Sequence, residues 1–174
     1  MKPVFTRWIH HHGFTSKYYC YYYILPLNSK QATMGALLGR ILTRGSQDYP
    51  SLKAIRDRGD DLYGTVVYFD MNKYLDQLIF EAKLIMPNFA LLGEEGTEEE
   101  AMDFFHSLLY RPLLDEEGNF SREIFEQEKE MLHQELDGLN KNPSSYAHRR
   151  CIELLFEGSS LGQYKYGDRA TLKE

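Results

Sequence analysis

The sequence has few cysteines and no long hydrophobic run. Its two cysteines, Cys20 and Cys151, lie far apart, and neither belongs to a CxxC pair or to a Cys/His pair with metal-ligand spacing. This argues against a cysteine-based metal site and favours a reducing compartment. The N-terminus lacks the apolar run of a signal peptide, and no window approaches the roughly 20 apolar residues of a membrane span. We therefore predict a soluble, cytoplasmic protein with no membrane partner.

The sequence also lacks an excess of positive charge. Its 20 Lys and Arg residues stand against 26 Asp and Glu residues, which gives a net charge of −6. A general nucleic-acid binder needs the opposite sign, so nucleic acid is excluded as a partner. The GxSxG motif, glycine-rich phosphate loops, EF-hand loops and the HExxH zinc helix are absent as well. Most enzyme classes lose their support at this point.

The composition that remains is that of a globular domain. Hydrophobic residues make up 43% of the 174 residues and charged residues 26%, so a sizeable core can be buried. The last residues, 168–174, resemble a capped helix start that runs off the end of the chain. We expect residues 1–174 to form a single domain that is incomplete at its C-terminus.

Hydrophobic periodicity predicts the secondary structure. A hairpin is expected from Val4–Ile9 and Lys17–Leu25, and further strands from 65–70 and from 78 to Pro87. Helices are expected around residues 34–42, from the cap Ser51 to about Leu62, from Thr97 to Pro112, from the cap Ser121 to about Asn140, and from 143 to Phe156. The order contains no strict βαβ alternation. We predict an α+β fold in which helices pack on one face of an antiparallel sheet.

The longest predicted helix carries two carboxylates within its apolar stripe. Glu128 and Glu135 lie two turns apart on the side that also carries Phe125, Met131 and Leu132. An unpaired buried carboxylate costs several kcal/mol, so each glutamate needs a cation, a metal or hydrogen-bond donors nearby. Alternatively, both glutamates lie at the margin of the stripe and reach solvent.

Several segments together resemble the insulinase or pitrilysin family of zinc metallopeptidases, which are inverzincins and include the mitochondrial processing peptidases. In that family an early helix carries H-x-x-E-H and precedes a Tyr-Pro turn, and here the segment from Ala36 to Ser46 precedes Tyr49-Pro50. The third zinc ligand of the family is a glutamate on a later helix with a second glutamate seven residues on, as for Glu128 and Glu135. The resemblance covers roughly residues 17–168. It implies the N-terminal part of an insulinase-like, LuxS-like metallohydrolase domain.

The H-x-x-E-H motif itself is degenerate. The positions of its two histidines and its glutamate hold Ala36, Gly39 and Arg40, and none of these residues can bind zinc or activate a water molecule. The resemblance therefore implies a non-peptidase subunit without a cofactor that pairs with a homologous subunit that has kept H-x-x-E-H. We expect Arg40 to replace the metal as the counter-charge of Glu128, so that Arg40→Met costs roughly 3 kcal/mol.

The resemblance also places a peptide substrate. In active family members the peptide adds as a strand to a sheet edge beside the zinc helix, and the most similar segment here consists of Thr65, Val66, Val67, Tyr68 and Phe69. The first hypothesis is a catalytically inactive subunit that completes a peptide-binding chamber with an active partner. Two alternatives stay open. One is a peptide-binding or assembly module without such a partner, and the other is a metal site built from Glu128, Glu130, His133 and an N-terminal histidine.

Overall fold

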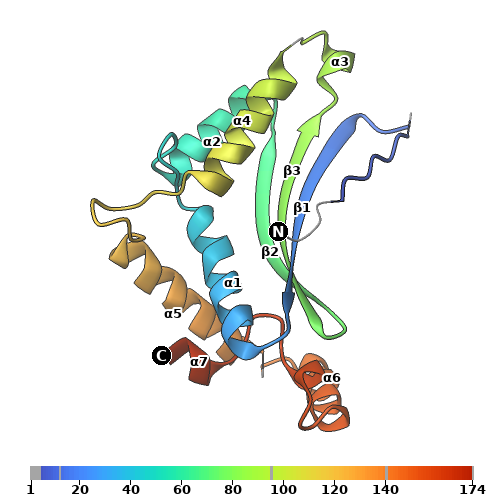
Figure 1. Cartoon of the computed structure of the whole chain (residues 1–174), viewed down its shortest axis with the longest axis vertical. Coiled ribbons are helices and arrows are strands. Elements are labelled where there is room, and N and C mark those ends of the chain that lie inside the picture. The colour runs from blue at the N-terminus through green and yellow to red at the C-terminus, as the bar shows by residue number, and fades with distance from the viewer. Residues whose placement is uncertain (1–4, 12, 95, 140, 174) are drawn as a thin grey trace.

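The computed structural model describes residues 5–11, 13–94, 96–139 and 141–173. Figure 1 shows a three-stranded antiparallel sheet with helices gathered on one side. The strands are β1 (Ser16–Pro26), β2 (Val66–Tyr74) and β3 (Gln77–Pro87), in the spatial order β1-β3-β2. The helices are α1 (Ser29–Leu42), α2 (Leu52–Asp61), α3 (Phe89–Leu92), α4 (Thr97–Tyr110), α5 (Arg122–Gly138), α6 (Pro143–Leu155) and α7 (Arg169–Lys173), with a 3-10 turn η1 (Ser160–Gly162) before α7.

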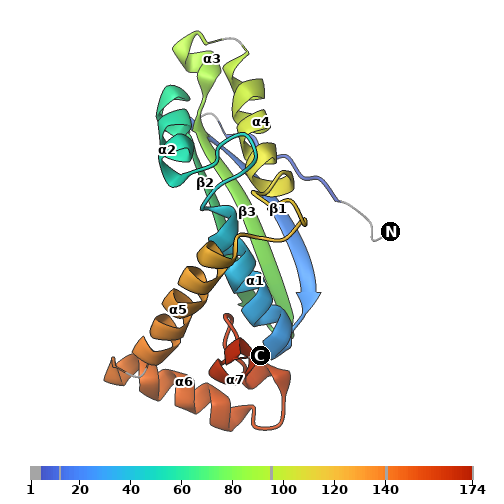
Figure 2. The same ribbon diagram turned by 90° about the vertical axis from the view of Figure 1, so that its left-hand side faces the viewer.

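The central strand β3 organises the core. Its residues alternate between buried and half-buried, and the buried set consists of Leu78, Phe80, Ala82, Leu84 and Met86. Side chains of a strand alternate between its two faces, so one face of β3 is covered along its whole length. Helices α1, α2 and α4 lie on that side in both views (Figures 1 and 2). The predicted α+β class, with helices on one face of an antiparallel sheet, is confirmed.

The predicted N-terminal hairpin is wrong. Residues 5–11 form no strand, and β1 pairs with β3 instead, with Tyr21 opposite Ala82. Val4, which was expected to begin the first arm, lies outside the described residues. The distant pairing turns Tyr21 and Tyr23 toward α4, where Tyr21 stacks on Phe105 with ring centroids 5.3 Å apart. This aromatic packing against a helix is unavailable to a hairpin made from the N-terminal segment alone.

Side-chain caps begin several helices, as the sequence indicates. The hydroxyl of Ser51 accepts a hydrogen bond from the amide of Ala54, and Ser121 caps α5 in the same way. Helix α4 differs, because Gly96 occupies the cap position and Thr97 is already the first helical residue. The short helix α3 was not expected from the sequence. Asn140, the predicted end of α5, lies outside the described residues.

No helix in the described part of the chain is both long enough and apolar enough to span a bilayer. The two cysteines are both unpaired thiols, half-buried at Cys20 and exposed at Cys151.

Candidate functional site

Helix α1 presents the degenerate motif to β2. Asn28 caps this helix, and small residues let it approach the strand closely. A Cβ atom added to Gly39 would lie 3.4 Å from the carbonyl oxygen of Phe69. One turn earlier, Ala36 is also buried. The three motif positions thus lie together between α1 and β2, with Arg40 at the rim.

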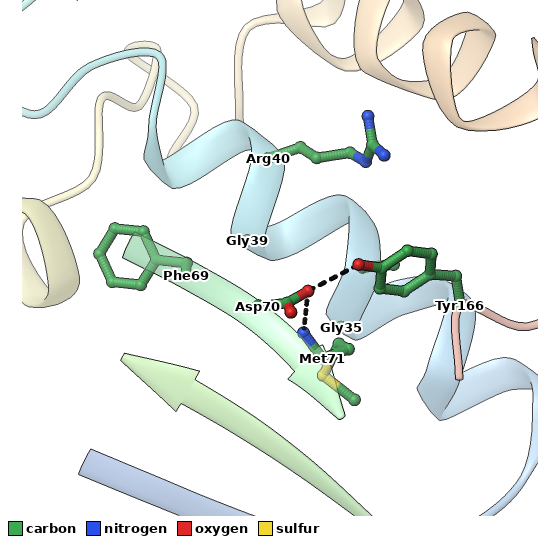
Figure 3. A pocket seen from close by; sticks show the side chains of 8 residues that line it. Gly35, Gly39, Arg40, Phe69, Asp70, Met71 and Tyr166 are labelled. Atoms are coloured by element: carbon green, nitrogen blue, oxygen red, sulfur yellow. Dashed lines mark hydrogen bonds between the residues drawn. The ribbon is translucent and has the colours of Figure 1, made fainter. Parts of the chain in front are cut away.

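A cavity of about 160 Å³ lies beside these positions. Its lining comes from α1, from β2 and from the segment before α7, and consists of Gly35, Ala36, Gly39, Arg40, Phe69, Asp70, Met71 and Tyr166. Figure 3 shows the Arg40 side chain extending away from Phe69 and Met71, while Asp70 and Tyr166 point toward each other. The cavity therefore adjoins the three positions of the degenerate motif, and Glu128 is not among its lining residues.

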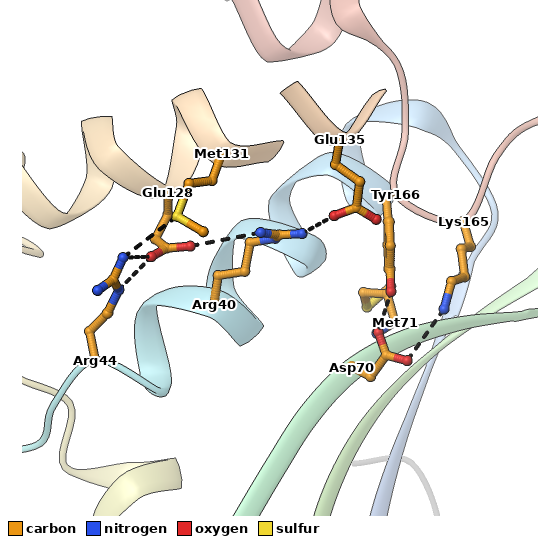
Figure 4. A network of polar contacts seen from close by, with 9 residues as sticks. All are labelled: Arg40, Arg44, Asp70, Met71, Glu128, Met131, Glu135, Lys165 and Tyr166. Carbon is orange, nitrogen blue, oxygen red and sulfur yellow. Dashed lines mark hydrogen bonds and ion pairs between the residues drawn. The ribbon is translucent and has the colours of Figure 1, made fainter. Parts of the chain in front are cut away.

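Arg40 of α1, Arg44 from the turn that follows α1 and two glutamates of α5 form an ion-pair network (Figure 4). Arg44 forms an ion pair with Glu128, and Arg40 forms one with Glu135. Nη1 of Arg40 also lies 3.9 Å from Oε2 of Glu128. Guanidinium groups suit such bridging because they offer five donors in a planar fork. The network joins α1 to α5 across the rim of the cavity.

The two glutamates differ in burial. The side chain of Glu128 is 5% exposed, as expected for an inward-facing carboxylate, whereas that of Glu135 is 37% exposed and lies at the margin of the stripe. The expected contact of Arg40 with Glu128 is the longer one, because Arg44 is the closer partner of Glu128. The sequence-based prediction did not include Arg44. Arg44 lies in the turn after α1, four residues after Arg40, and no sequence pattern points to its contact with Glu128.

The segment 161–168, named the strap below, closes the other side of the cavity. The hydroxyl of Tyr166 donates to Oδ1 of Asp70 at 2.8 Å, and Nζ of Lys165 lies 3.3 Å from Oδ2 of the same carboxylate. The ammonium group of Lys73 donates to the carbonyl oxygens of Leu161 and Gln163, both at 2.9 Å. Burial raises the pKa of Tyr166 and lowers the pKa of Lys73.

The predicted peptide-binding segment lies at an edge of the sheet. Val66, Val67, Tyr68 and Phe69 belong to β2, which pairs with β3 on one side only. Thr65 precedes the strand and is buried, and its amide donates to the carbonyl oxygens of Gly59 and Leu62. Whether this edge receives a peptide stays a prediction.

The described residues contain no group of three or more His, Cys, Asp or Glu side chains that could hold a metal ion. The residues of the alternative metal site point in different directions, because Glu128 is buried whereas Glu130 is exposed and accepts a hydrogen bond from Gln134. Nδ1 of His133 lies 3.7 Å from a carboxylate oxygen of Asp137. Of the N-terminal histidines, His12 lies outside the described residues.

No protein-family model matches the chain. A curated relative, the probable inactive metalloprotease YmfF of Bacillus subtilis (strain 168), is 28% identical over 146 residues, which are 83% of this chain and 34% of that protein. A solved structure of a conserved protein from Enterococcus faecalis V583 matches with a TM-score of 0.85 at 24% identity, over 92% of this chain and 38% of that chain.

A second solved structure decides the fold. It is described as a peptidase M16 inactive domain from Pseudomonas fluorescens and matches with a TM-score of 0.61 at 16% identity, over 92% of this chain and 35% of that chain. The fold is that of an M16-type domain. These similarities support the resemblance to inactive proteins of the insulinase type. The chain spans about a third of the length of the curated relative and of both solved chains.

Proposed function

We propose that the chain is a catalytically inactive subunit or domain of an insulinase-like metallopeptidase and contributes to a peptide-binding chamber with an active partner. One observation carries the proposal. The corner between α1 and α5, where the resemblance places a zinc ion, is occupied by the ion pairs of Arg40 with Glu135 and of Arg44 with Glu128.

The chemistry of the network supports a permanently metal-free site. Arg40 and Arg44 together carry two positive charges, equal to the charge of one zinc ion, and they neutralise Glu128, which the resemblance assigns to zinc binding, and its partner Glu135. Arginine stays protonated at every physiological pH, so its guanidinium cannot act as a metal ligand. With an alanine and a glycine at the remaining motif positions, no group is left to activate a water molecule.

The edge of β2 supports a role in peptide binding. An unpaired strand edge offers backbone donors and acceptors to an extended chain, and the Phe69 end of this edge adjoins the cavity. A peptide bound there would lie beside the degenerate motif of α1. The cleaving residues would then come from a homologous subunit with an intact H-x-x-E-H motif.

Co-expression with such a homologue, first sought in the neighbouring gene, tests the proposal. The two chains should co-purify, and the complex should cleave a quenched fluorescent peptide library that this chain alone leaves intact. If the homologue alone cleaves the library at the full rate of the mixture and the two chains elute separately, the proposal is wrong.

A second candidate, an assembly module without an active partner, is favoured by the other face of the sheet. Tyr18, Tyr22 and Ile24 of β1 and Tyr68 of β2 are each more than half exposed. Such an apolar face suits self-association. Sedimentation velocity distinguishes the candidates, because a self-associating chain should dissociate on Tyr22→Ser but not on Tyr146→Ser, which removes an exposed tyrosine from α6. A monomer at all concentrations would exclude this candidate.

A further inference from the structure

The backbone groups at the outer edge of β2 can be assigned from its hydrogen bonds. The amide of Met71 donates to Oδ1 of its neighbour Asp70 at 2.8 Å, which assigns this group to the outer side of the strand. In an antiparallel pair, successive residues alternate between pairing with the neighbouring strand and pointing away from it. The backbone groups of Val67 and Phe69 therefore point to the same unpaired side as those of Met71.

Helix α2 closes one end of this edge. The amide of Thr65 donates to the carbonyl oxygen of Gly59 at 3.0 Å. In return, Gly59 leaves no room beside the strand, since a Cβ atom at this position would lie 2.6 Å from the carbonyl oxygen of Thr65. Both outward groups of Thr65 are thus covered by the chain itself.

The strap closes the other end. The Asp70 carboxylate covers the amide of Met71 and is itself bound by Tyr166 and Lys165. Beyond it, the side chain of Lys73 is bound to two carbonyl oxygens of the strap. A second contact fixes the strap to α1, because Gly167 fits against Thr33 so tightly that a Cβ atom would lie 1.9 Å from Oγ1 of that residue.

Between these two closed ends, the backbone groups of Val67 and Phe69 have no outward hydrogen bond to any part of the chain that the structure describes. We propose that the free backbone groups of Val67 and Phe69 form a window in the edge of β2 that pairs with an extended peptide. About three peptide residues take part in this pairing, and the strap fixes which peptide residue lies opposite Phe69. The window rests on the proposed function. It adds a limit on the length of peptide that can pair with β2 and a preference for one kind of side chain opposite Phe69.

The charges around the window indicate the side chain that fits there. A peptide residue opposite Phe69 directs its side chain either to solvent or toward the cavity beside α1. Both charged groups at the rim of that cavity are already neutralised, Arg40 by Glu135 and Asp70 by Lys165. A charged peptide side chain would find no counter-ion, so the cavity accepts a small uncharged side chain.

A length series of peptides tests the window on the full chain. The probes are acetylated, amidated peptides of alternating Thr and Val with three, five and nine residues, and the readouts are the dissociation constant and the hydrogen exchange of individual amides. We expect protection of the Val67 and Phe69 amides, and less than a twofold gain in affinity between five and nine residues. An Asp70→Ala variant frees the amide of Met71 for pairing. In this variant the nine-residue peptide should bind at least fivefold more tightly than the five-residue peptide.

Asp76→Ala is the matched control, because Asp76 lies exposed in the turn between β2 and β3 and makes no side-chain contact in the described structure. If the wild-type affinity rises twofold or more from five to nine residues, the window is wrong while peptide binding stands. If no probe protects Val67 or Phe69 in any variant, peptide binding at this edge fails as well.

Discussion

Glu128 is the residue on which the metal-free site depends. Its side chain is 5% exposed, and its only close cation among the described residues is Arg44, with Arg40 at 3.9 Å. Removing one partner of a buried ion pair leaves an uncompensated charge, which costs more than the pair itself contributes. The stability of the site therefore depends more on Arg44 than on the arginine that stands in the degenerate motif.

Arg44→Met should lower the free energy of unfolding by about 3 kcal/mol, because it leaves Glu128 buried without its nearest counter-charge. Arg40→Met is the matched comparison and should cost only about 1 kcal/mol, since Glu135 is 37% exposed and can be solvated by water. Urea unfolding of both variants measures the difference. The larger loss for Arg40→Met that the sequence alone suggests would show that Arg40 is the principal partner of Glu128.

The carboxylate of Glu98 makes stability depend on pH. Burial alone would raise its pKa, but hydrogen bonds from the Lys17 ammonium and the Tyr19 hydroxyl outweigh burial and lower the pKa below its usual 4.5. A carboxylate with a lowered folded-state pKa stabilises the fold above the unfolded pKa, and this contribution is lost as the pH falls through the folded value. Wild type should thus be more stable than Glu98→Gln at pH 7, and the difference should shrink below about pH 4.5. The exposed neighbour Glu99 provides the control Glu99→Gln, and a difference that stays constant down to pH 3 would refute the assignment.

At the scale of the elements, the strap is held by its fit against α1. Gly167 and Gly158 both adopt positive φ angles, 79° and 77°, but only Gly167 has close neighbours. Gly158→Ala should therefore cost about 1 kcal/mol of backbone strain. Gly167→Ala adds a clash with Thr33 and should cost about 3 kcal/mol or detach the strap. Thermal unfolding of both variants measures the difference, and equal losses would show that the strap is not seated as described.

The elements show which parts of the structure can be predicted from the sequence. Strand β3 and the capped starts of α2 and α5 were predicted because their signals are local, as in the alternation from Leu78 to Met86 and the cap of Ser121. The pairing of β1 was missed because strand partners depend on distant packing, here that of Tyr21 on Phe105. In the site, the inward direction of Glu128 follows from its spacing within the apolar stripe, whereas the motif positions follow from the family resemblance.

The closed ends of the β2 edge could not be predicted in the same way. The contacts of Gly59 with Thr65 and of the strap with Asp70 join segments whose sequences contain no pattern that refers to each other. The same holds for the division of partners between Arg40 and Arg44, because Arg44 lies in the turn after α1 and helical spacing fixes neither its direction nor its distance to α5.

At the scale of the whole molecule, the chain combines a preserved fold with an altered site. The sheet and the helices on one of its faces match an M16-type domain, and the corner between α1 and α5 holds the ion pairs of Arg40 with Glu135 and of Arg44 with Glu128. The chain spans about a third of the length of its curated relative. We infer that the domain retains the shape of a peptidase subunit and has exchanged zinc chemistry for a fixed ion-pair network.

The zinc content of the protein, purified without chelators, tests this account most directly. The matched variant A36H/G39E/R40H restores the H-x-x-E-H motif beside Glu128 and should gain bound zinc, because a Cβ atom at position 39 makes only an ordinary contact with Phe69. Elemental analysis by mass spectrometry should find less than about 0.1 zinc per chain in the wild type. One tightly held zinc per wild-type chain would contradict the account.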